Sequence, residues 1–306
     1  GEAVIDWKAL PDQAFSSGVV PIQTSKGCPY RCAFCNFVRD RRLMFAKPID
    51  ALVEELRAVS ECGARYVWFV DDNFRLGAKD LDAVCRRFVE ERLDIRWMTM
   101  LRADTLDRAD ADLLRRAGCV EVQLGLESGD SRILKNMNKG ASPSLYRRVV
   151  KRVLGAGMTC SCYFIFGFPG ETDETALRTR AFIRDLESPD LDGTLMWSLF
   201  PFSLYPLSPI YEVEERRKYG LSGYLREWRH DTMDSARAME HAREAFFELE
   251  NSCPVYRGDN LNMLLDLGAK RRKEFLVRRH RLSKEALKRP LGKDEVRNTF
   301  SAIFSC

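Results

Sequence analysis

The sequence contains no long hydrophobic run, no signal peptide and only three histidines. A membrane-spanning helix needs ~18 consecutive apolar residues, and no segment approaches that length. A secretory leader would open with basic residues followed by a short apolar stretch, and the first residues show neither. We therefore expect a chain that is neither anchored in a membrane nor exported. No internal repeat or low-complexity tract stands out.

The length and composition are those of a globular protein. The 306 residues are 45% hydrophobic, 31% charged and 10% aromatic. This mixture excludes a disordered chain, a collagen-like repeat and a small protein held together by disulfides. The length allows one large domain or two modest ones.

The net charge of +4 is concentrated in one segment. Between Lys270 and Arg289 there are ten Lys or Arg against two Glu, a charge of +8, so the rest of the chain carries about −4. A basic segment of this kind is either a nucleic-acid contact or a solvated helix face. We favour the solvated face and do not expect a nucleic-acid partner.

The ten cysteines fall into two groups. Seven are scattered or loosely paired, namely Cys62, Cys85, Cys119, Cys160, Cys162, Cys253 and Cys306. A chain of this length and apolar content does not need a disulfide framework, so a reducing, cytoplasmic location fits best. The other three, Cys28, Cys32 and Cys35, lie together in one short segment.

Short β-branched or aromatic runs alternate with longer amphipathic stretches, as where Leu52, Leu56 and Val59 share one helix face. Repeated βα units of this kind predict an α/β fold with a parallel sheet. The expected strands are Val19–Thr24, Tyr66–Val70, Ile95–Leu101, Val120–Leu126, Thr159–Phe166 and Thr194–Phe200. Six units fall short of the eight that close a barrel, so we predict a partial (βα)6 barrel.

The pattern changes beyond the sixth strand, which predicts three parts. Residues 1–17 form a lead-in segment, residues 18–206 the partial barrel, and residues 207–306 a mostly helical extension that covers the barrel mouth. The expected helices of the extension are Pro209–Tyr219, Met233–Asn251 and Gly268–Leu287. Within the barrel, Ser142 before Pro143 and Thr172 before two acidic residues predict helix starts.

The cysteine-rich segment directly follows the first predicted strand. Its spacing is C-x3-C-x2-C, from Cys28 through Cys32 to Cys35, in a loop that also contains Gly, Pro and Arg. Three thiolates on one loop can hold three corners of a cubic iron–sulfur cluster. The fourth iron is then left open, and an open metal position is where a ligand binds.

Two other chemistries fit this loop less well. Structural zinc needs four ligands, usually as two C-x2-C pairs, and none of His230, His241 and His280 lies near the loop in sequence. A redox dithiol would not need the third cysteine. We therefore favour the cluster over zinc and over a site without metal.

The loop resembles the signature of the radical S-adenosylmethionine (SAM) enzymes, including the aromatic residue Phe34 before the third cysteine. The resemblance extends roughly from Pro21 to Pro206. It implies a [4Fe–4S] cluster on the three cysteines, with SAM chelating the fourth iron through its amino and carboxylate groups. It also implies a partial (βα)6 barrel, which agrees with the strand count.

Other predicted strand ends resemble the SAM-binding segments of the same family. They are Asp71–Phe74, Leu124–Gly129 with Met137–Gly140 after it, and Phe166–Thr172. The resemblance implies cofactor contacts from Phe34, Asp71, Asp72, Asn73, Arg102, Glu127, Ser128, Lys139 and Gly167. Such sites lie at the C-terminal ends of barrel strands, where glycines let the backbone approach a ligand and helix N-termini favour a carboxylate.

Three motifs most resemble the cobalamin-associated branch of the family. They are Glu127-Ser128-Gly129, Asn138-Lys139-Gly140 and Pro169-Gly170-Glu171-Thr172. A B12-binding domain usually precedes the barrel in that branch, and Ile5-Asp6-Trp7 resembles the linker that follows it. No B12 domain is present in the sequence. Either it has been removed or this member works without cobalamin, so cobalamin use stays open.

The resemblance also suggests a reaction. Some radical SAM epimerases of the aminoglycoside type use a lone cysteine to return a hydrogen atom to a substrate radical, and Cys253 beyond the barrel suits that role. We therefore expect epimerisation, with Cys253 as the catalytic hydrogen donor. The alternatives are a cobalamin-dependent C-methyltransferase, a dehydrogenase or dehydratase of antibiotic biosynthesis, and a metal-binding module without catalysis.

The expected partners follow from the same resemblance. Flavodoxin or ferredoxin would supply an electron, and SAM would be cleaved to methionine and a 5′-deoxyadenosyl radical that removes hydrogen from a small natural product. Acidic side chains such as Asp192 or Glu212 would suit a cationic aminosugar.

Overall fold

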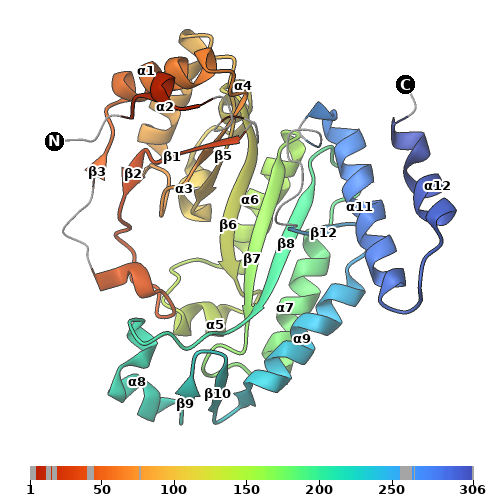
Figure 1. Cartoon of the computed structure of the whole chain (residues 1–306). Helices are drawn as coiled ribbons and strands as arrows, with labels where there is room; N and C mark the ends of the chain where they lie inside the picture. The colour runs from red at the N-terminus through yellow and green to blue at the C-terminus, as the bar shows by residue number, and fades with distance from the viewer. Residues whose placement is uncertain are drawn as a thin grey trace.

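The computed structural model describes residues 5–11, 15, 19–39, 45–75, 77–255, 264 and 266–304. Figure 1 shows a curved sheet with an open concave side and with most of its helices along the outer side. Of the predicted features, Cys306 lies outside the described residues, as does most of the lead-in segment before residue 18.

Seven parallel strands form the main sheet, in the order β1-β4-β5-β6-β7-β8-β12. They are β1 (Val19–Ile22), β4 (Tyr66–Phe69), β5 (Arg96–Leu101), β6 (Cys119–Glu127), β7 (Thr159–Phe166), β8 (Leu195–Pro201) and β12 (Cys253–Pro254). The first six match the predicted strands to within two residues at each end. Each pairs with the next along the chain, which confirms the partial (βα)6 barrel.

The connecting helices bury one apolar stripe each against the outer face of the sheet. They are α1 (Ile49–Glu61), α2 (Ala78–Glu90), α3 (Ala103–Arg108), α4 (Ala111–Arg116), α5 (Ser131–Asn136), α6 (Pro143–Gly155) and α7 (Asp173–Leu186). In α1 the buried side chains are Leu52, Val53, Leu56 and Val59, spaced as a helix face requires.

The two predicted helix starts are confirmed. The Ser142 hydroxyl accepts from the Leu145 N–H at 3.3 Å, with proline at the first helical position of α6. Thr172 and Thr175 form a reciprocal capping box at the start of α7. These caps fix where each helix begins and therefore where the loop before it must end.

The extension beyond β8 contains more short elements than the sequence predicts. The stretch Pro209–Tyr219 divides into a 3-10 turn, η4 (Pro209–Tyr211), and α8 (Val213–Lys218). The stretch Met233–Asn251 opens with β11 (Met233–Asp234) before α9 (Ser235–Glu248). The predicted helix Gly268–Leu287 corresponds to α11 (Ala269–Ala286).

Several elements of the extension were not among the sequence-based expectations. They are β9 (Ser222–Tyr224) and β10 (Glu227–His230), which form an antiparallel sheet with β11, the seventh barrel strand β12, and α12 (Lys293–Phe304). Strands β9, β11 and β12 have only two or three residues, too few to show alternation, and β10 lacks the apolar run that marks the equally short β1 and β4.

The extension reaches both ends of the barrel. In Figure 1, α8, β9 and β10 lie beyond the C-terminal ends of β6, β7 and β8, whereas α11 and α12 stand beside β12. At the opposite end, Asp266 accepts from the Tyr66 hydroxyl at 2.7 Å and pairs with Arg65 at 2.6 Å. Tyr66 is the first residue of β4, so this contact lies at the N-terminal end of the barrel.

Candidate functional site

The cysteine loop lies at the C-terminal edge of the sheet, after β1 and the short strand β2 (Ser25–Lys26), which pairs with β3 (Phe45–Ala46). Cys32 is buried, and Cys28 and Cys35 are half-buried. The Cys35 N–H donates to the Cys32 carbonyl at 3.1 Å, which turns the chain sharply between the second and third cysteine.

The turn after α5 supports this loop. The Ala33 N–H donates to the Met137 carbonyl at 2.8 Å. Asn138 Nδ2 donates to the Arg31 carbonyl, also at 2.8 Å. The segment that follows β6 therefore fixes the height of the cysteine loop over the sheet.

The three cysteines interact electrostatically with one another and with two cations. Burial raises the pKa of the Cys28 and Cys35 thiols, and the negative charge of neighbouring cysteines raises it further. Arg102 lowers the pKa of Cys28, and Lys139 lowers that of Cys35. Arg102 and Lys139 offset part of the negative charge of the thiolates. A positively charged cofactor held between the sulfurs would offset the rest.

The donor set fits a cubic cluster. Among the described residues, no three His, Cys, Asp or Glu side chains converge on the position of a single metal ion. Structural zinc requires such convergence by four ligands. A cubic iron–sulfur cluster does not, because each cysteine binds a different iron.

Arg102 links the cysteine loop to the lysine-bearing turn. Its side chain is only 10% exposed, and its Nε donates to Asp104 Oδ1 at 2.9 Å. Nη2 donates to the Lys139 carbonyl at 2.8 Å, while Nη1 lies 4.0 Å from Cys32 Sγ. The guanidinium stacks 3.5 Å from the centre of the Tyr30 ring. A fixed positive charge therefore lies beside the middle cysteine.

Glu127 and Lys139 form a buried ion pair on the same side. Lys139 Nζ lies 2.9 Å from Glu127 Oε1, and their side chains are 10% and 8% exposed. Glu127 has a φ of +67°, at the point where β6 slips its register against β7. A Cβ on Gly125 would lie 2.3 Å from Glu127 Oε1, so the carboxylate crosses directly over this glycine. Lys139 Nζ also lies 5.7 Å from the centre of the Phe34 ring.

The two aspartates after β4 hold backbone and hydroxyl groups of the protein. Asp71 accepts four hydrogen bonds, from the N–H and hydroxyl groups of Thr24 and Ser25, at 2.5 to 2.9 Å. Asp72 accepts from the Gly27 N–H at 2.9 Å. Both carboxylates therefore position the entrance to the cysteine loop.

Asn73 differs from its two neighbours. It is 2% exposed, and neither its amide nitrogen nor its amide oxygen has a hydrogen-bond partner in the described structure. A buried amide without partners costs stability unless a ligand satisfies it. Among the predicted SAM contacts, Asn73 therefore has an amide without protein partners in the described structure, and its contact to SAM stays a prediction.

Ser128 lies beside the site with its hydroxyl already engaged. Its Oγ lies 3.0 Å from Thr179 Oγ1 on α7 and accepts from the Asp130 N–H at 3.1 Å. The residue is fully buried. The contact to SAM that the resemblance implies for Ser128 stays a prediction, and these bonds favour a positioning role.

Gly167 follows β7 with a φ of +83°. A Cβ there would lie 2.4 Å from the Trp228 ring and 2.6 Å from Ala238. His230 Nε2 lies 3.3 Å from the Gly167 carbonyl, and the Gly167 N–H donates to Glu171. Trp228 and His230 were missed from the sequence because they lie on β10, whose residues Glu-Trp-Arg-His form no apolar run.

Glu171 is the most perturbed carboxyl group near the site. It is fully buried, one of its oxygens has no partner in the described structure, and burial raises its pKa to about 8. The motif that contains it was recognised in the sequence, but the residue itself was not predicted to belong to the site.

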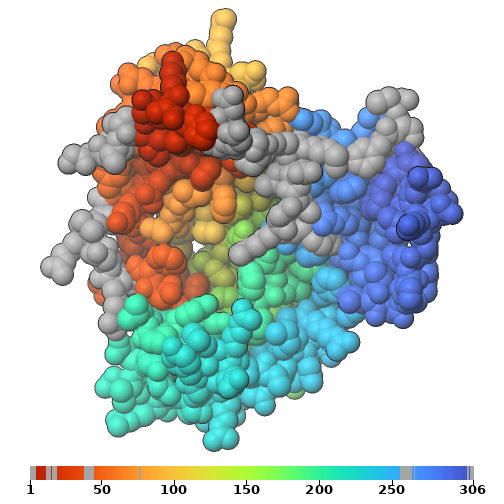
Figure 2. All heavy atoms as spheres, viewed as in Figure 1, coloured from red at the N-terminus to blue at the C-terminus, as the bar shows by residue number. Residues whose placement is uncertain are grey.

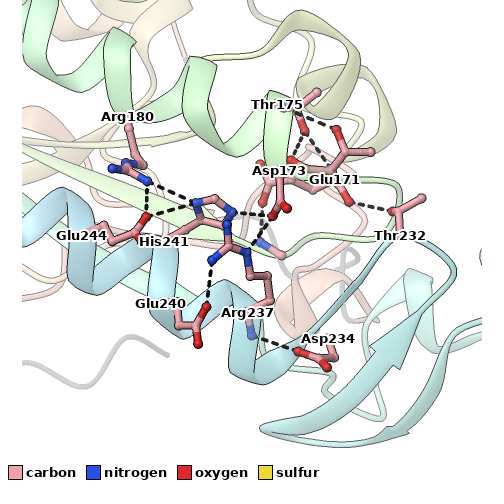
Figure 3. Close-up of polar contacts among 12 residues, drawn as sticks. Glu171, Asp173, Thr175, Arg180, Thr232, Asp234, Arg237, Glu240, His241 and Glu244 are labelled. Atoms are coloured by element: carbon pink, nitrogen blue, oxygen red, sulfur yellow. Dashed lines mark hydrogen bonds and ion pairs between the residues drawn. The ribbon is translucent and has the colours of Figure 1, made fainter.

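Figure 3 shows the polar contacts that join α7 to α9 behind this turn. His241 Nε2 and Arg237 Nε each lie 2.8 Å from Asp173 Oδ1. Arg180 Nη1 lies 3.4 Å from His241 Nδ1 and also pairs with Glu244. The network holds α9, and with it the small sheet that covers Gly167, against the barrel.

Cys253 lies away from the cysteine loop. It is on β12, opposite Met196 near the N-terminal end of β8, and is fully buried with Leu264 and Leu276. Burial raises the pKa of its thiol well above the ordinary value. The strand ends that carry the cluster loop are several residues further along the sheet, so this placement does not favour the predicted donor role.

The two acids proposed for an aminosugar lie far from each other in the fold, and only Glu212 is near the cysteine loop, where it lines a pocket with Arg31 and Ala33. Asp192 is exposed just before β8, where its charge acts on Lys273 of α11. Glu212 is exposed at the start of α8. In the basic helix α11, Arg272 and Lys284 are each 7% exposed, so part of its charge is used in packing.

Comparison with known proteins identifies the family. Residues 22–183 match the family model of the radical SAM superfamily, which is more than half of the chain. The chain belongs to the radical SAM superfamily. Its cofactors are therefore a [4Fe–4S] cluster and SAM, as the loop of Cys28, Cys32 and Cys35 predicts. No helix in the described ranges is long and apolar enough to cross a bilayer.

Two curated relatives are named methyltransferases. The chain is 33% identical over 187 residues, 58% of its length, to an uncharacterised methyltransferase from Pyrococcus horikoshii. It is 32% identical over 173 residues, 55% of its length, to bacteriochlorophyllide d C-12(1)-methyltransferase from Chlorobaculum tepidum. It spans about two fifths of the length of these relatives, 40% and 38% respectively.

Solved structures share the fold. The radical SAM methyltransferase TsrM from Kitasatospora setae aligns with a TM-score of 0.57 and 22% identity over 65% of this chain and 39% of its own. The cobalamin-dependent enzyme OxsB aligns with a TM-score of 0.58 and 13% identity over 94% of this chain and 53% of its own. At these identities the likeness concerns the fold.

Proposed function

We propose that this radical SAM protein takes part in a cobalamin-dependent methyl transfer to a small molecule. Support comes chiefly from two of the relatives above 30% identity, which are named methyltransferases. A third, at 32% identity, is named tRNA-2-methylthio-N(6)-dimethylallyladenosine synthase. The motifs of the cobalamin-associated branch, from Glu127 to Thr172, agree with this choice. This makes the earlier alternative the preferred reaction.

Epimerisation with Cys253 as hydrogen donor has less support. The thiol is fully buried against Leu264 and Leu276, and a donor must reach a substrate beside the SAM site. No residue in the described structure supports dehydrogenation or dehydration. An aminosugar substrate has equally little support, since Asp192 lies before β8 and Glu212 is a single exposed carboxylate beside Arg31.

The residues around the cysteine loop would bind and orient SAM. When bound, the cluster supplies the electron that cleaves the sulfonium, and a small electron-transfer protein must deliver that electron. The amide of Asn73, which has no hydrogen-bond partner in the described structure, supports a contact with the amino-acid group of SAM. The fixed charges of Arg102 and Lys139 favour thiolate at the cysteines. The Gly167 turn is closed by Trp228, and its N–H and carbonyl are engaged by Glu171 and His230, so it fixes the end of β7.

The test follows the methyl group of SAM. The anaerobically reconstituted chain is incubated with reductant, with SAM labelled in its methyl group, and with or without added cobalamin. We expect the protein to move label from SAM to the added cobalamin. An Asn73→Ala variant should lose most of this transfer, whereas Leu177→Ala on the outer face of α7 should keep it.

Two results would contradict the proposal. One is a preparation that cleaves SAM reductively and moves no label to cobalamin. The other is label that stays entirely in methionine while deuterium from heavy water enters a product, which would restore epimerisation.

A further inference from the structure

The two faces of the barrel sheet are covered very differently. Side chains that point outward, such as Val67, Trp97, Leu124 and Phe164, are completely buried under the helices. The alternate side chains point to the concave side. A closed eight-stranded barrel fills its interior with such side chains, but this crescent leaves space between its first and last strands.

The end of that space nearest the N-terminal ends of the strands is filled. Tyr66, Met98 and Val120 form a separate buried cluster on the concave side. Asp266 and Arg65 close over the Tyr66 hydroxyl at the N-terminal end. The concave side is therefore a cup with a floor, open toward the cysteine loop. Figure 2 shows a recess between the orange N-terminal residues and the olive and green strands.

Above this floor the walls expose large apolar side chains. Trp68 on β4 is 42% exposed, Met100 on β5 is 37% exposed and Phe200 on β8 is 44% exposed. On the β8 side the Tyr163 and Phe200 rings lie nearly parallel, at 21° and 6.4 Å between centroids. The cup therefore has two aromatic walls, Trp68 on β4 and the Tyr163–Phe200 pair on β7 and β8, with β5 and β6 between them.

The strands between these walls contribute polar groups that already satisfy one another. Gln123 Nε2 donates to Glu121 Oε1 at 3.2 Å, and Ser161 Oγ donates to the same oxygen at 2.8 Å. Burial raises the pKa of Glu121, and the nearby charge of Arg272 partly offsets it. The cup thus has few charges to offer a strongly ionic ligand.

These features determine what chemistry would fill the cup. Exposed apolar surface costs roughly 25 cal/mol per Å² until something covers it. Aromatic walls bind best to a flat unsaturated ring, which stacks at little cost in conformational freedom. A polyol or a polycation would make little apolar contact with the walls. The polar groups of such a ligand would also find no hydrogen-bond partners there.

We propose that the concave face binds the substrate through a flat, largely uncharged aromatic ring system, held between Trp68 and the Tyr163–Phe200 pair. The inference rests on the proposed function, since it assigns the substrate class of the same enzyme. It departs from the aminosugar that the sequence suggested, because none of the wall residues is acidic.

The test uses two probes and the full reconstituted chain with SAM bound. 2-Naphthol is a small, neutral, flat and fluorescent ring system. Gentamicin is a cationic aminosugar. We expect 2-naphthol to bind saturably in fluorescence titrations, and gentamicin to leave its bound fraction unchanged.

Substitutions locate the probe. Trp68→Ala and Phe200→Ala should each weaken 2-naphthol binding about tenfold, as expected when one stacked ring is lost. Leu177→Ala removes a side chain of similar exposure, 51%, from the outer face of α7 and should leave the affinity unchanged. Circular dichroism and SAM binding of each variant check that its fold is intact.

The outcomes separate the two proposals. Equal 2-naphthol affinity in wild type, Trp68→Ala and Phe200→Ala would overturn the inference, as would gentamicin displacing the probe. A protein that binds 2-naphthol between these walls but moves no methyl label to cobalamin would keep the inference and reject methyl transfer. A protein that moves methyl label to cobalamin but does not bind 2-naphthol would keep methyl transfer and reject the inference.

Discussion

Single residues around the cysteine loop divide into those already satisfied by the protein and those left free for a ligand. Asp71, Asp72 and Ser128 use their polar atoms within the chain. Asn73 and one oxygen of Glu171 have no partner in the described structure. The sequence resemblance treated Asp71, Asp72, Asn73 and Ser128 alike, as contacts to SAM, because it compares positions within motifs. It cannot show which side chain is already hydrogen-bonded.

A substitution at Gly125 tests how closely the Glu127–Lys139 ion pair approaches the β6 backbone. A Cβ at Gly125 would lie 2.3 Å from the Glu127 carboxylate and 3.1 Å from Lys139 Nζ. Gly125→Ala should therefore displace the pair, weaken SAM binding at least tenfold and cost about 1–3 kcal/mol of unfolding free energy. SAM titration and urea unfolding measure both effects.

The control for Gly125→Ala is Gly155→Ala in α6, where an added Cβ meets nothing within 4 Å. It should leave SAM binding unchanged and raise stability by up to about 1 kcal/mol. Equal effects of the two substitutions would contradict the close approach at Gly125.

Glu171 predicts a pH dependence of stability. Its pKa is 4.5 as a free side chain and about 8 when buried in the fold. Between these values the folded protein holds a proton that the unfolded chain releases, so this group makes stability fall as pH rises from about 4.5 to 8. Glu171→Gln should flatten the fall in melting temperature over that window, by the equivalent of a few kcal/mol.

Glu214→Gln on the exposed surface of α8 is the matched control and should retain the wild-type slope. If Glu171→Gln loses melting temperature as steeply as wild type between those pH values, the carboxyl is not held neutral by burial.

At the scale of elements, the barrel strands and their helices were predictable and the covering elements were not. Strands β4 to β8 are four to nine residues long, are flanked by turn residues, and are followed by helices whose caps can be read in the sequence. β9 to β12 are two to four residues long and depend on tertiary contacts. Trp228, His230 and the true position of Cys253 all lie on these short strands, so the sequence could not place them.

The contact between α7 and α9 carries the small sheet that closes over Gly167. His241 is fully buried in it, beside Asp173 and Arg180, and its ring stacks on Phe166 at 6.4 Å. His241→Ala should cost about 2–4 kcal/mol, because it leaves a cavity and unpaired polar groups. The shift of the urea-unfolding midpoint measures this cost.

Arg243→Ala, on the exposed side of the same helix, should change stability by less than about 0.5 kcal/mol. A His241→Ala variant as stable as Arg243→Ala would show that the network in Figure 3 does not hold α9.

At the scale of the whole molecule, the protein is a curved sheet whose cysteine loop lies at the C-terminal edge of its concave side. The partial barrel and the cluster loop at its C-terminal edge follow from six βα units that do not close. The family and both cofactors could be predicted from one loop, because three closely spaced cysteines allow little other chemistry. The substrate could not, since it depends on which alternate side chains face the interior.

The cysteine trio is the central claim, and iron and sulfide analysis tests it most directly. After anaerobic reconstitution we expect about four irons and four sulfides per chain, and an electron paramagnetic resonance signal that changes when SAM is added. Cys28→Ser, Cys32→Ser and Cys35→Ser should each lose the cluster, whereas Cys62→Ser, away from the loop, should keep it. A protein that takes up zinc without sulfide, or whose signal ignores SAM, would contradict the account.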